Sequence, residues 1–117
     1  MSHKFENLNA WQVAKRLAIA IYDITASYPD NEKFGLTSQT NRAAVSIPSN
    51  IAEGTSRQSS RDFSHFLDIS LGSAFELETL IIIACDRNLI DIEAKTKIEN
   101  LIVQTEKLIN GLKRSLK

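Results

Sequence analysis

Apolar and small residues recur along the chain at alternating steps of three and four, the spacing of one face of an α-helix. Four such stripes are separated by short polar connections, and they predict helices over about 9–28, 36–52, 60–87 and 92–116. No alternating, strand-like pattern competes with them. Because short connections make consecutive helices antiparallel neighbours, the pattern predicts an all-α fold: an antiparallel up-down-up-down four-helix bundle that forms one domain over residues 1–117.

Capping residues set the expected boundaries of these helices. Asn9 is expected to cap the first helix, with Gln12 three residues later reaching back to it. Gly54 is expected near the end of the second helix, and Ser59 or Ser60 caps the third.

Pro48 lies inside the second predicted helix, where it removes the backbone hydrogen bond to Ala44. The chain there is either one kinked helix or two helices. The stripe Gln39, Ala43, Ile47 and Ile51 stays in phase across the proline, which favours a single helix kinked at Pro48.

The fourth predicted helix carries a near-heptad seam, which is expected to face the other three helices. Its members are Ala94, Ile98, Leu101, Thr105, Leu108 and Leu112.

The third predicted helix has more apolar surface than one bundle can bury. If Phe63, Ser70, Leu77 and Ile81 face the core, then Leu71, Phe75 and Ile82 lie to one side, and Ile69, Leu80 and Ile83 lie to the other. A wide core stripe is one explanation. A helix that is apolar on nearly all sides is more typical of contact with a second chain, so we expect a homo-oligomer whose interface includes Leu71, Phe75 and Ile82.

Composition narrows the class of protein. The chain has 14 Lys and Arg against 14 Asp and Glu, and this zero net charge excludes a protein that coats nucleic acid along its whole surface. The single cysteine, Cys85, excludes an intramolecular disulfide and favours a reducing compartment. No apolar run is long enough for a membrane span, and the N-terminus lacks the apolar stretch of a signal peptide, so we expect a cytoplasmic protein with no membrane partner.

The charges nevertheless separate once an antiparallel bundle is assumed. One end gathers a surplus of cations, and the other end has a surplus of carboxylates. A chance asymmetry of a solvated surface is the simpler explanation. Repeated around a cyclic assembly, the basic end would become a ring suited to phosphates, so its cations are candidate nucleic-acid-binding residues: Arg57, Arg61, Lys113, Arg114 and Lys117.

Catalytic and metal-binding patterns are missing from the sequence. A di-iron bundle needs Glu-x-x-His pairs, and neither His3 nor His65 follows a Glu by three residues. Glu53 and Glu76 are the best pair for acid/base chemistry, but a structural polar cluster with Asn50 and Ser73 explains them better. There is no phosphate loop, zinc-ligand spacing or nucleophile elbow, so we expect no enzyme, no cofactor and no metal.

Several segments resemble a bacterial four-helix-bundle family named for proteins encoded in intervening sequences of 23S rRNA genes. The stretch 50–54 (Asn-Ile-Ala-Glu-Gly) is the most specific. The other matching segments are 8–12, 34–39, 42–49, 63–67 and 72–76.

That family is similar to the accessory variability protein of diversity-generating retroelements, a pentameric bundle that binds a reverse transcriptase and nucleic acid. The resemblance implies a ring-shaped homopentamer without catalytic residues, with RNA or a reverse transcriptase as partner. We therefore expect a non-enzymatic accessory or scaffold protein associated with nucleic acid. The alternative is an interaction module that binds only proteins.

Overall fold

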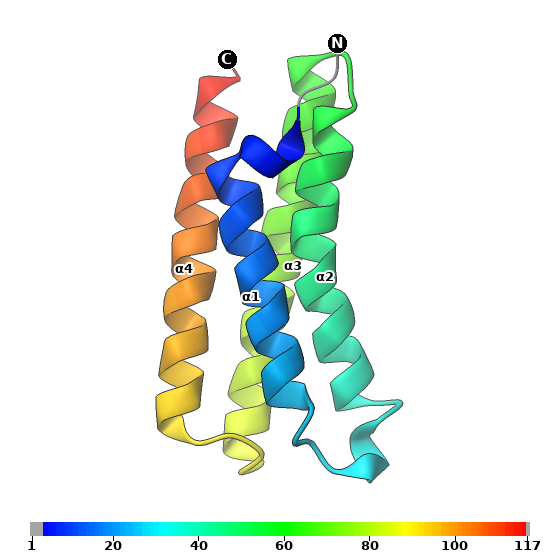
Figure 1. Cartoon of the computed structure of the whole chain (residues 1–117), viewed down its shortest axis with the longest axis vertical. Helices are drawn as coiled ribbons and strands as arrows, with labels where there is room; N and C mark the ends of the chain where they lie inside the picture. The colour runs from blue at the N-terminus through cyan, green and yellow to red at the C-terminus, as the bar shows by residue number, and fades with distance from the viewer. Residues whose placement is uncertain (1–3, 117) are drawn as a thin grey trace.

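The computed structural model describes residues 4–116 of the chain. Four long helices account for most of it: α1 (Asn9–Thr25), α2 (Leu36–Thr55), α3 (Ser60–Asp86) and α4 (Ile92–Ser115). Two single-turn 3-10 helices, η1 (Phe5–Asn7) and η2 (Asp30–Glu32), precede α1 and α2, and the described residues include no strand. In Figure 1 the chain runs down α1, up α2, down α3 and up α4. The prediction of an all-α fold with four helices is confirmed.

Local hydrogen bonds explain where the helices begin. The Ser59 hydroxyl accepts a hydrogen bond from the Asp62 amide (3.1 Å), and the Asp91 carboxylate accepts one from the Ala94 amide (2.8 Å), so α3 and α4 have side-chain caps. The expected cap at Asn9 is wrong, because Asn9 is already the first helical residue of α1. The Gln12 amide instead donates to the Glu6 carbonyl (2.8 Å), which ties η1 to α1.

Helix α2 runs through Pro48 as a single helix, so the chain does not form two helices there. Gly54 lies within α2 rather than beyond its end, because the helix continues to Thr55. Its place in the structure is explained by packing: a Cβ atom at Gly54 would lie 2.7 Å from Cδ1 of Phe63.

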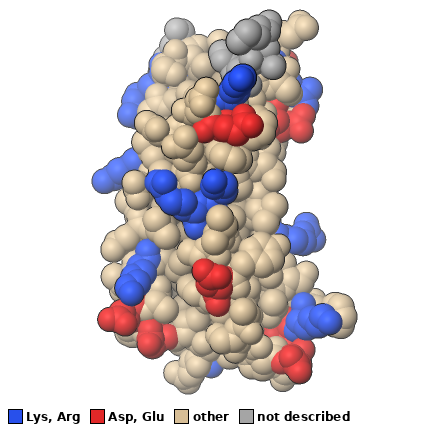
Figure 2. Space-filling view, in the orientation of Figure 1, with Lys and Arg blue, Asp and Glu red and all other residues tan. Residues whose placement is uncertain are grey.

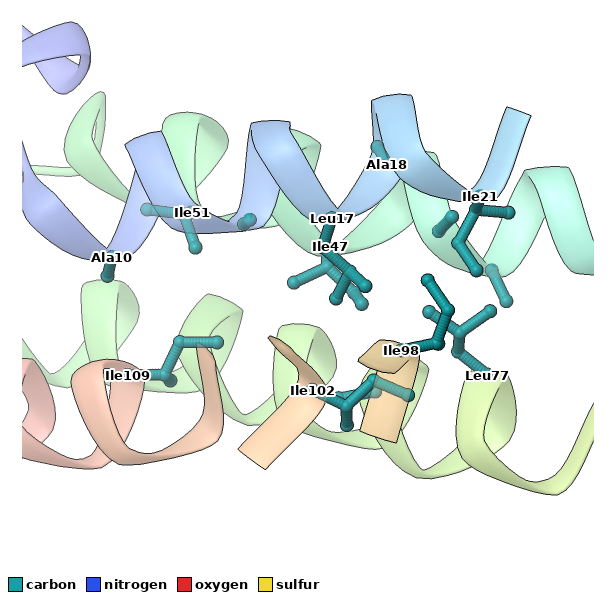
Figure 3. Close-up of a cluster of buried hydrophobic side chains, with 14 of the residues drawn as sticks. Ala10, Leu17, Ala18, Ile21, Ile47, Ile51, Leu77, Ile98, Ile102 and Ile109 are labelled. Atoms are coloured by element: carbon teal, nitrogen blue, oxygen red, sulfur yellow. The ribbon is translucent and has the colours of Figure 1, made fainter. Parts of the chain in front are cut away.

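The core fills the space between the four helices (Figure 3), where each fully buried Leu or Ile side chain contributes roughly 1.5–3 kcal/mol. Its largest members come from every helix: Leu17, Ile21, Ile47, Ile51, Leu67, Leu77, Ile81, Ile102 and Ile109. The predicted seam of α4 is wrong in part, because Ile102 and Ile109 are buried while Leu101 and Leu108 are only partly buried. The buried positions 98, 102, 105 and 109 keep the alternating steps of four and three, but the stripe is rotated about the helix axis toward Ile102 and Ile109.

Of the helices that the structure describes, none is both long enough and apolar enough to cross a membrane.

Candidate nucleic-acid interface

The turn between α2 and α3 and the last turn of α4 both lie at the end of the bundle that is at the top of Figure 1. Helix α3 begins here with Ser60 and Arg61, and α4 ends here with Lys113 and Arg114 in its last turn. The start of α3 lies beside the end of α4 because consecutive helices run in opposite directions. The fold therefore brings together cations that are about 50 residues apart in the sequence.

A surface pocket of about 350 Å³ lies between these two helix ends. Three of the five predicted nucleic-acid-binding residues line it, namely Arg61, Lys113 and Arg114, and no acidic side chain does. The remaining lining residues are Ser60, Ser64, Asn110 and Leu116. We name these seven residues the basic pocket. Its two hydroxyls and one amide are further hydrogen-bond donors, and the sequence analysis missed them because they become neighbours only when α3 and α4 come together.

The cations of the basic pocket differ in how they are paired. Lys113 forms an ion pair with Asp68 of α3, which fixes α4 against α3. Within residues 4–116, neither Arg61 nor Arg114 forms an ion pair, and both are exposed. Arginine presents a planar fork of donors that suits phosphate oxygens. These two guanidinium groups are therefore the ones available to an anion.

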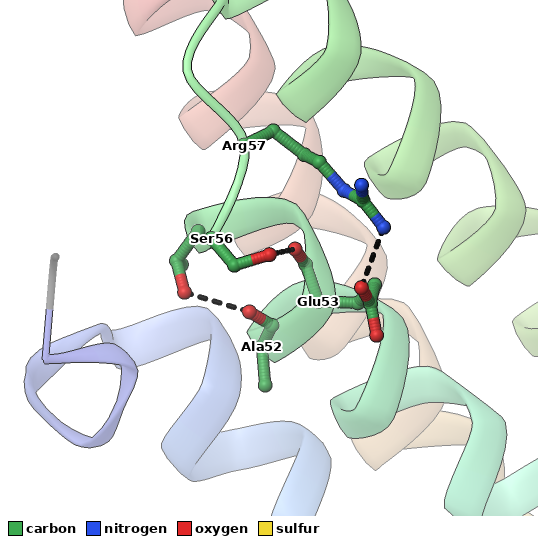
Figure 4. A network of polar contacts seen from close by, with 5 residues as sticks. Ala52, Glu53, Ser56 and Arg57 are labelled. Atoms are coloured by element: carbon green, nitrogen blue, oxygen red, sulfur yellow. Dashed lines mark hydrogen bonds and ion pairs between the residues drawn. The ribbon is translucent and has the colours of Figure 1, made fainter.

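Arg57 lies outside the basic pocket. Its guanidinium donates to the Glu53 carboxylate (2.6 Å), as Figure 4 shows, and lies over the ring of Phe66 at 4.6 Å from the centroid. The Ser56 hydroxyl donates to the Glu53 carbonyl in the same turn (2.7 Å). The Arg57 charge is thus already partnered. Lys117 falls outside the described residues.

A polar cluster does connect α2 and α3, but only two of its four predicted members belong to it. The hydroxyls of Ser46 and Ser73 are hydrogen-bonded (2.7 Å), and the Asn50 amide donates to the Ser46 hydroxyl (2.9 Å) and carbonyl (2.8 Å). One turn away, the buried Ser70 hydroxyl donates to the Ile47 carbonyl (2.7 Å). These bonds fix the relative position of α2 and α3 beside Pro48.

Glu53 and Glu76 do not approach each other, and the predicted carboxylate pair is wrong. Both are exposed. Glu53 is next to Gly54, which packs against Phe63 and so lies near the start of α3, whereas Glu76 is one turn beyond Ser73. At a rise of ~1.5 Å per residue, those two levels of α3 are roughly 15 Å or more apart. Glu76 instead lines a polar pocket with Arg42 and Ser46.

Comparison with known protein families decides the affiliation of the chain. Residues 6–111 match the model of the 23S rRNA-intervening sequence protein family. The chain belongs to this family. No curated protein matches the chain.

A solved structure supports the assignment to the 23S rRNA-intervening sequence proteins. It is a protein of unknown function from the S23 ribosomal protein family of Bacteroides thetaiotaomicron. It superposes with a TM-score of 0.82 at 26% sequence identity, over 89% of this chain and 97% of that one. The four-helix arrangement described above is therefore shared with a relative.

The predicted interface residues of this 23S rRNA-intervening sequence protein lie on the surface of α3 to different degrees. Phe75 is 62% exposed and Ile82 is 40% exposed, whereas Leu71 is partly buried. On the other side of the helix, Ile69 and Ile83 are exposed, but Leu80 is buried in the core, contrary to the sequence analysis.

Within residues 4–116, no three His, Cys, Asp or Glu side chains form a group that could hold a metal ion. The basic pocket has cations that suit the phosphates of the predicted nucleic-acid ligand.

Proposed function

We propose that this protein is a non-enzymatic, cytoplasmic, homo-oligomeric accessory or scaffold protein that binds the phosphate backbone of RNA in its basic pocket. The observation that carries the proposal is that Arg61, Lys113 and Arg114, from two different helices, line one pocket that contains no acidic side chain. Hydrogen bonds between guanidinium groups and phosphate oxygens are charge-assisted and frequently bidentate. The zero net charge confines such binding to this end of the bundle.

The assembly that we propose is a ring-like homopentamer. The number five comes from the resemblance to the accessory variability protein, and the exposed Phe75 and Ile82 supply apolar surface for contacts between subunits. Each subunit would add one basic pocket to the ring, so that a single RNA strand could contact several pockets and gain avidity. We also propose that α2 bends at Pro48, where the proline removes one backbone hydrogen bond of the helix. The protein partner that we propose for the ring is a reverse transcriptase, as the same resemblance implies.

Binding of a single-stranded RNA to the parent protein and to the double variant Arg61→Gln/Arg114→Gln tests the pocket. We expect the variant to bind at least tenfold more weakly at about 50 mM salt, where phosphate contacts are strong. The slope of log affinity against log salt should become shallower by about 1.4 for each pocket that the strand contacts, because each lost phosphate contact on a single strand accounts for about 0.7. Fluorescence anisotropy over a salt series measures both quantities.

The matched control is Lys95→Gln/Lys97→Gln, which removes two cations from the first turns of α4, at the opposite end of the bundle. This control should bind RNA like the parent. Equal losses in both double variants would show that RNA responds to total charge and not to the basic pocket.

The second candidate is an interaction module that binds only proteins. It is favoured by the large exposed apolar residues, of which Phe75 is one. If the parent protein binds no RNA at about 50 mM salt, this candidate replaces the first.

A further inference from the structure

A shallow groove runs along the surface between α1 and α2. Two adjoining hollows of about 430 and 700 Å³ form it, and they are continuous because Tyr22 and Val45 line both. We call it the α1–α2 groove, and we define it by Lys15, Ile19, Tyr22, Phe34, Arg42 and Val45. Large apolar side chains are unusually open here, since Phe34 is 90% and Tyr22 51% exposed. Within one subunit, nothing among the described residues covers them.

The charged side chains that line the α1–α2 groove itself have one sign, although Glu76 of α3 lies beyond one edge, where it shares a polar pocket with Arg42. Lys15, Lys33 and Arg42 line the two hollows, and no acidic residue does. The ammonium group of Lys33 lies 5.6 Å from the centroid of the Phe34 ring. Figure 2, which shows the side of the molecule with α1 in front, has blue side chains at mid-height and at the right-hand edge with uncharged surface between them, and red side chains above and below on the same face. The groove is therefore lined by apolar and uncharged polar side chains together with three cations.

A second unpartnered surface is the broad solvent-facing side of α3, about 140° of the helix at ~100° per residue, and we call it the α3 face. Phe75 and Ile82 lie toward one edge of it, Ile69 lies at the other edge, and Gly72 and Ile83 lie between them. All five residues are exposed. Gly72 lies in the middle of a 27-residue helix, where glycine is less favourable than alanine. A Cβ atom built on Gly72 would meet no other atom within 4 Å, so no contact inside the subunit requires a glycine there. A close approach by a second chain is one reason to retain a glycine at such a position.

The charge on α3 has the opposite sign to that of the groove. From Asp62 to Asp86 the helix contains five acidic residues and no Lys or Arg. Asp68 and Glu76 are exposed beside the apolar members of the α3 face. These carboxylates lie among the apolar side chains of the α3 face; Asp68 is paired with Lys113 of the same subunit, whereas Glu76 and Asp86 form no ion pair among the described residues. An apolar and acidic face thus complements a groove lined by apolar side chains and cations.

We propose that the α3 face of one copy docks into the α1–α2 groove of a second copy. This inference rests on the self-association proposed above and deepens it by naming the two surfaces that meet. Contact of two α3 faces would bring carboxylates together, and contact of two grooves would bring cations together, so the charges disfavour both symmetric pairings. A contact between two different surfaces leaves each copy with one free groove and one free face, and it propagates until a ring closes.

The α1–α2 groove also has features that suit single-stranded nucleic acid, because aromatic rings beside cations can stack bases. That occupant leaves the α3 face unexplained, since an acidic surface repels phosphates. A second copy accounts for both surfaces with one contact, and we therefore commit to it.

A complementation experiment tests the proposal. Phe75→Lys places a cation on the α3 face opposite the basic groove, and Tyr22→Asp places a carboxylate in the groove opposite the acidic face. Alone, each variant should have a mass near that of one 13.1 kDa chain in light scattering. An equimolar mixture should give a species of at least twice that mass, because the first variant keeps an intact groove and the second keeps an intact face, and the introduced cation and carboxylate attract each other where the two altered surfaces meet.

Matched controls separate this result from a general effect of surface charge. Ile92 in the first turn of α4 is 73% exposed and lies outside both surfaces. Ile92→Lys and Ile92→Asp should therefore keep the mass of the parent. Far-ultraviolet circular dichroism should show parental helix content for every variant, because the substituted side chains are exposed and do not belong to the core.

The other outcomes overturn the proposal in distinguishable ways. A monomeric parent contradicts the self-association itself. An oligomeric parent with an unaffected Tyr22→Asp variant leaves self-association standing and contradicts only the assignment of the groove. If Tyr22→Asp keeps the parental mass but loses binding to single-stranded RNA, the groove is a nucleic-acid surface. Variants that stay monomeric in the mixture would show that the two surfaces do not meet.

Discussion

Gly54 shows at the scale of one residue how closely α2 and α3 approach. It is buried, and a Cβ atom at this position would lie 2.7 Å from Cδ1 of Phe63 and 3.1 Å from Cβ of Phe66. Gly54→Ala should lower the free energy of unfolding by about 1–3 kcal/mol, because overpacking outweighs the higher helix propensity of alanine. Urea unfolding followed by circular dichroism measures the change.

Gly111 of α4 provides the matched control for this prediction. A Cβ atom there would have one neighbour, the end of the flexible Arg114 side chain at 3.7 Å. Gly111→Ala should therefore stabilise the protein by roughly 0.5–1 kcal/mol through helix propensity alone. Equal effects of the two substitutions would mean that Gly54 is retained for its backbone and not for the space that it leaves.

Residue-scale patterns predicted some features and missed others. Ser59 was recognisable as a cap because hydroxyls before a helix bond its first amides, a local effect. Asn88 adopts a positive φ of 63° just after α3, and Asn tolerates that conformation, but the sequence analysis assigned only a turn there. Gly54 was expected to end α2 because a glycine often does so, whereas its contact with Phe63 depends on another helix.

At the scale of helix pairs, α3 and α4 bring two carboxyl groups together. One carboxyl oxygen of Glu106 is buried without a hydrogen-bond partner among the described residues. Its burial, and secondarily the charge of Glu78 on α3, raise the pKa of the Glu106 carboxyl above its ordinary value. Between the ordinary and the raised pKa, the folded protein binds more protons than the unfolded chain, so stability falls as pH rises through this window.

Glu106→Gln should remove this pH dependence. We expect the variant to be more stable than the parent at pH 7, by up to about 1 kcal/mol, because the neutral amide carries no charge to desolvate and none for Glu78 to repel, and Glu106 is only partly buried. Below the ordinary pKa of Glu the difference should vanish. Urea midpoints measured from pH 4 to pH 7 test this, with the exposed Glu93→Gln of α4 as control. A difference that persists unchanged at pH 4 would contradict the pKa explanation.

The helices themselves were largely predictable because their period is a local property of the sequence. The rotation of each helix about its axis was less so. Ile102 and Ile109 are buried in the core, where the sequence pattern predicts Leu101 and Leu108. Leucine and isoleucine are equally apolar, so only packing against the other helices decides which pair is buried. The same limit explains Glu53, which lies about 200° around α2 from the buried Ile51 and therefore faces solvent.

At the scale of the whole molecule, the basic pocket was predictable in part. Antiparallel helices place the start of α3 beside the end of α4, and this brought Arg61, Lys113 and Arg114 onto the same end. The ion pair between Arg57 and Glu53 was not foreseen, although the two residues are four apart on one helical turn. The α1–α2 groove was missed because Phe34 comes from the connection between two helices, and no periodicity describes its direction.

The two surfaces and the basic pocket lead to one account of the molecule. In the assembly that we propose, the α3 face of one copy joins the α1–α2 groove of the next, and the ring would repeat a pocket whose two guanidinium groups form no ion pair among the described residues. The contact between copies and the repetition of the pocket depend on assembly, since a single bundle leaves Phe34, Tyr22 and Phe75 open to water, whereas the basic pocket itself lies within one subunit.

The mass of the parent protein in solution therefore tests the account most directly. Light scattering coupled to size exclusion, at micromolar concentration, should give about five times the 13.1 kDa of one chain. A mass of two, three or four chains would correct the proposed number of subunits and leave the proposed contact between copies in place. A stable species with the mass of one chain would contradict the account.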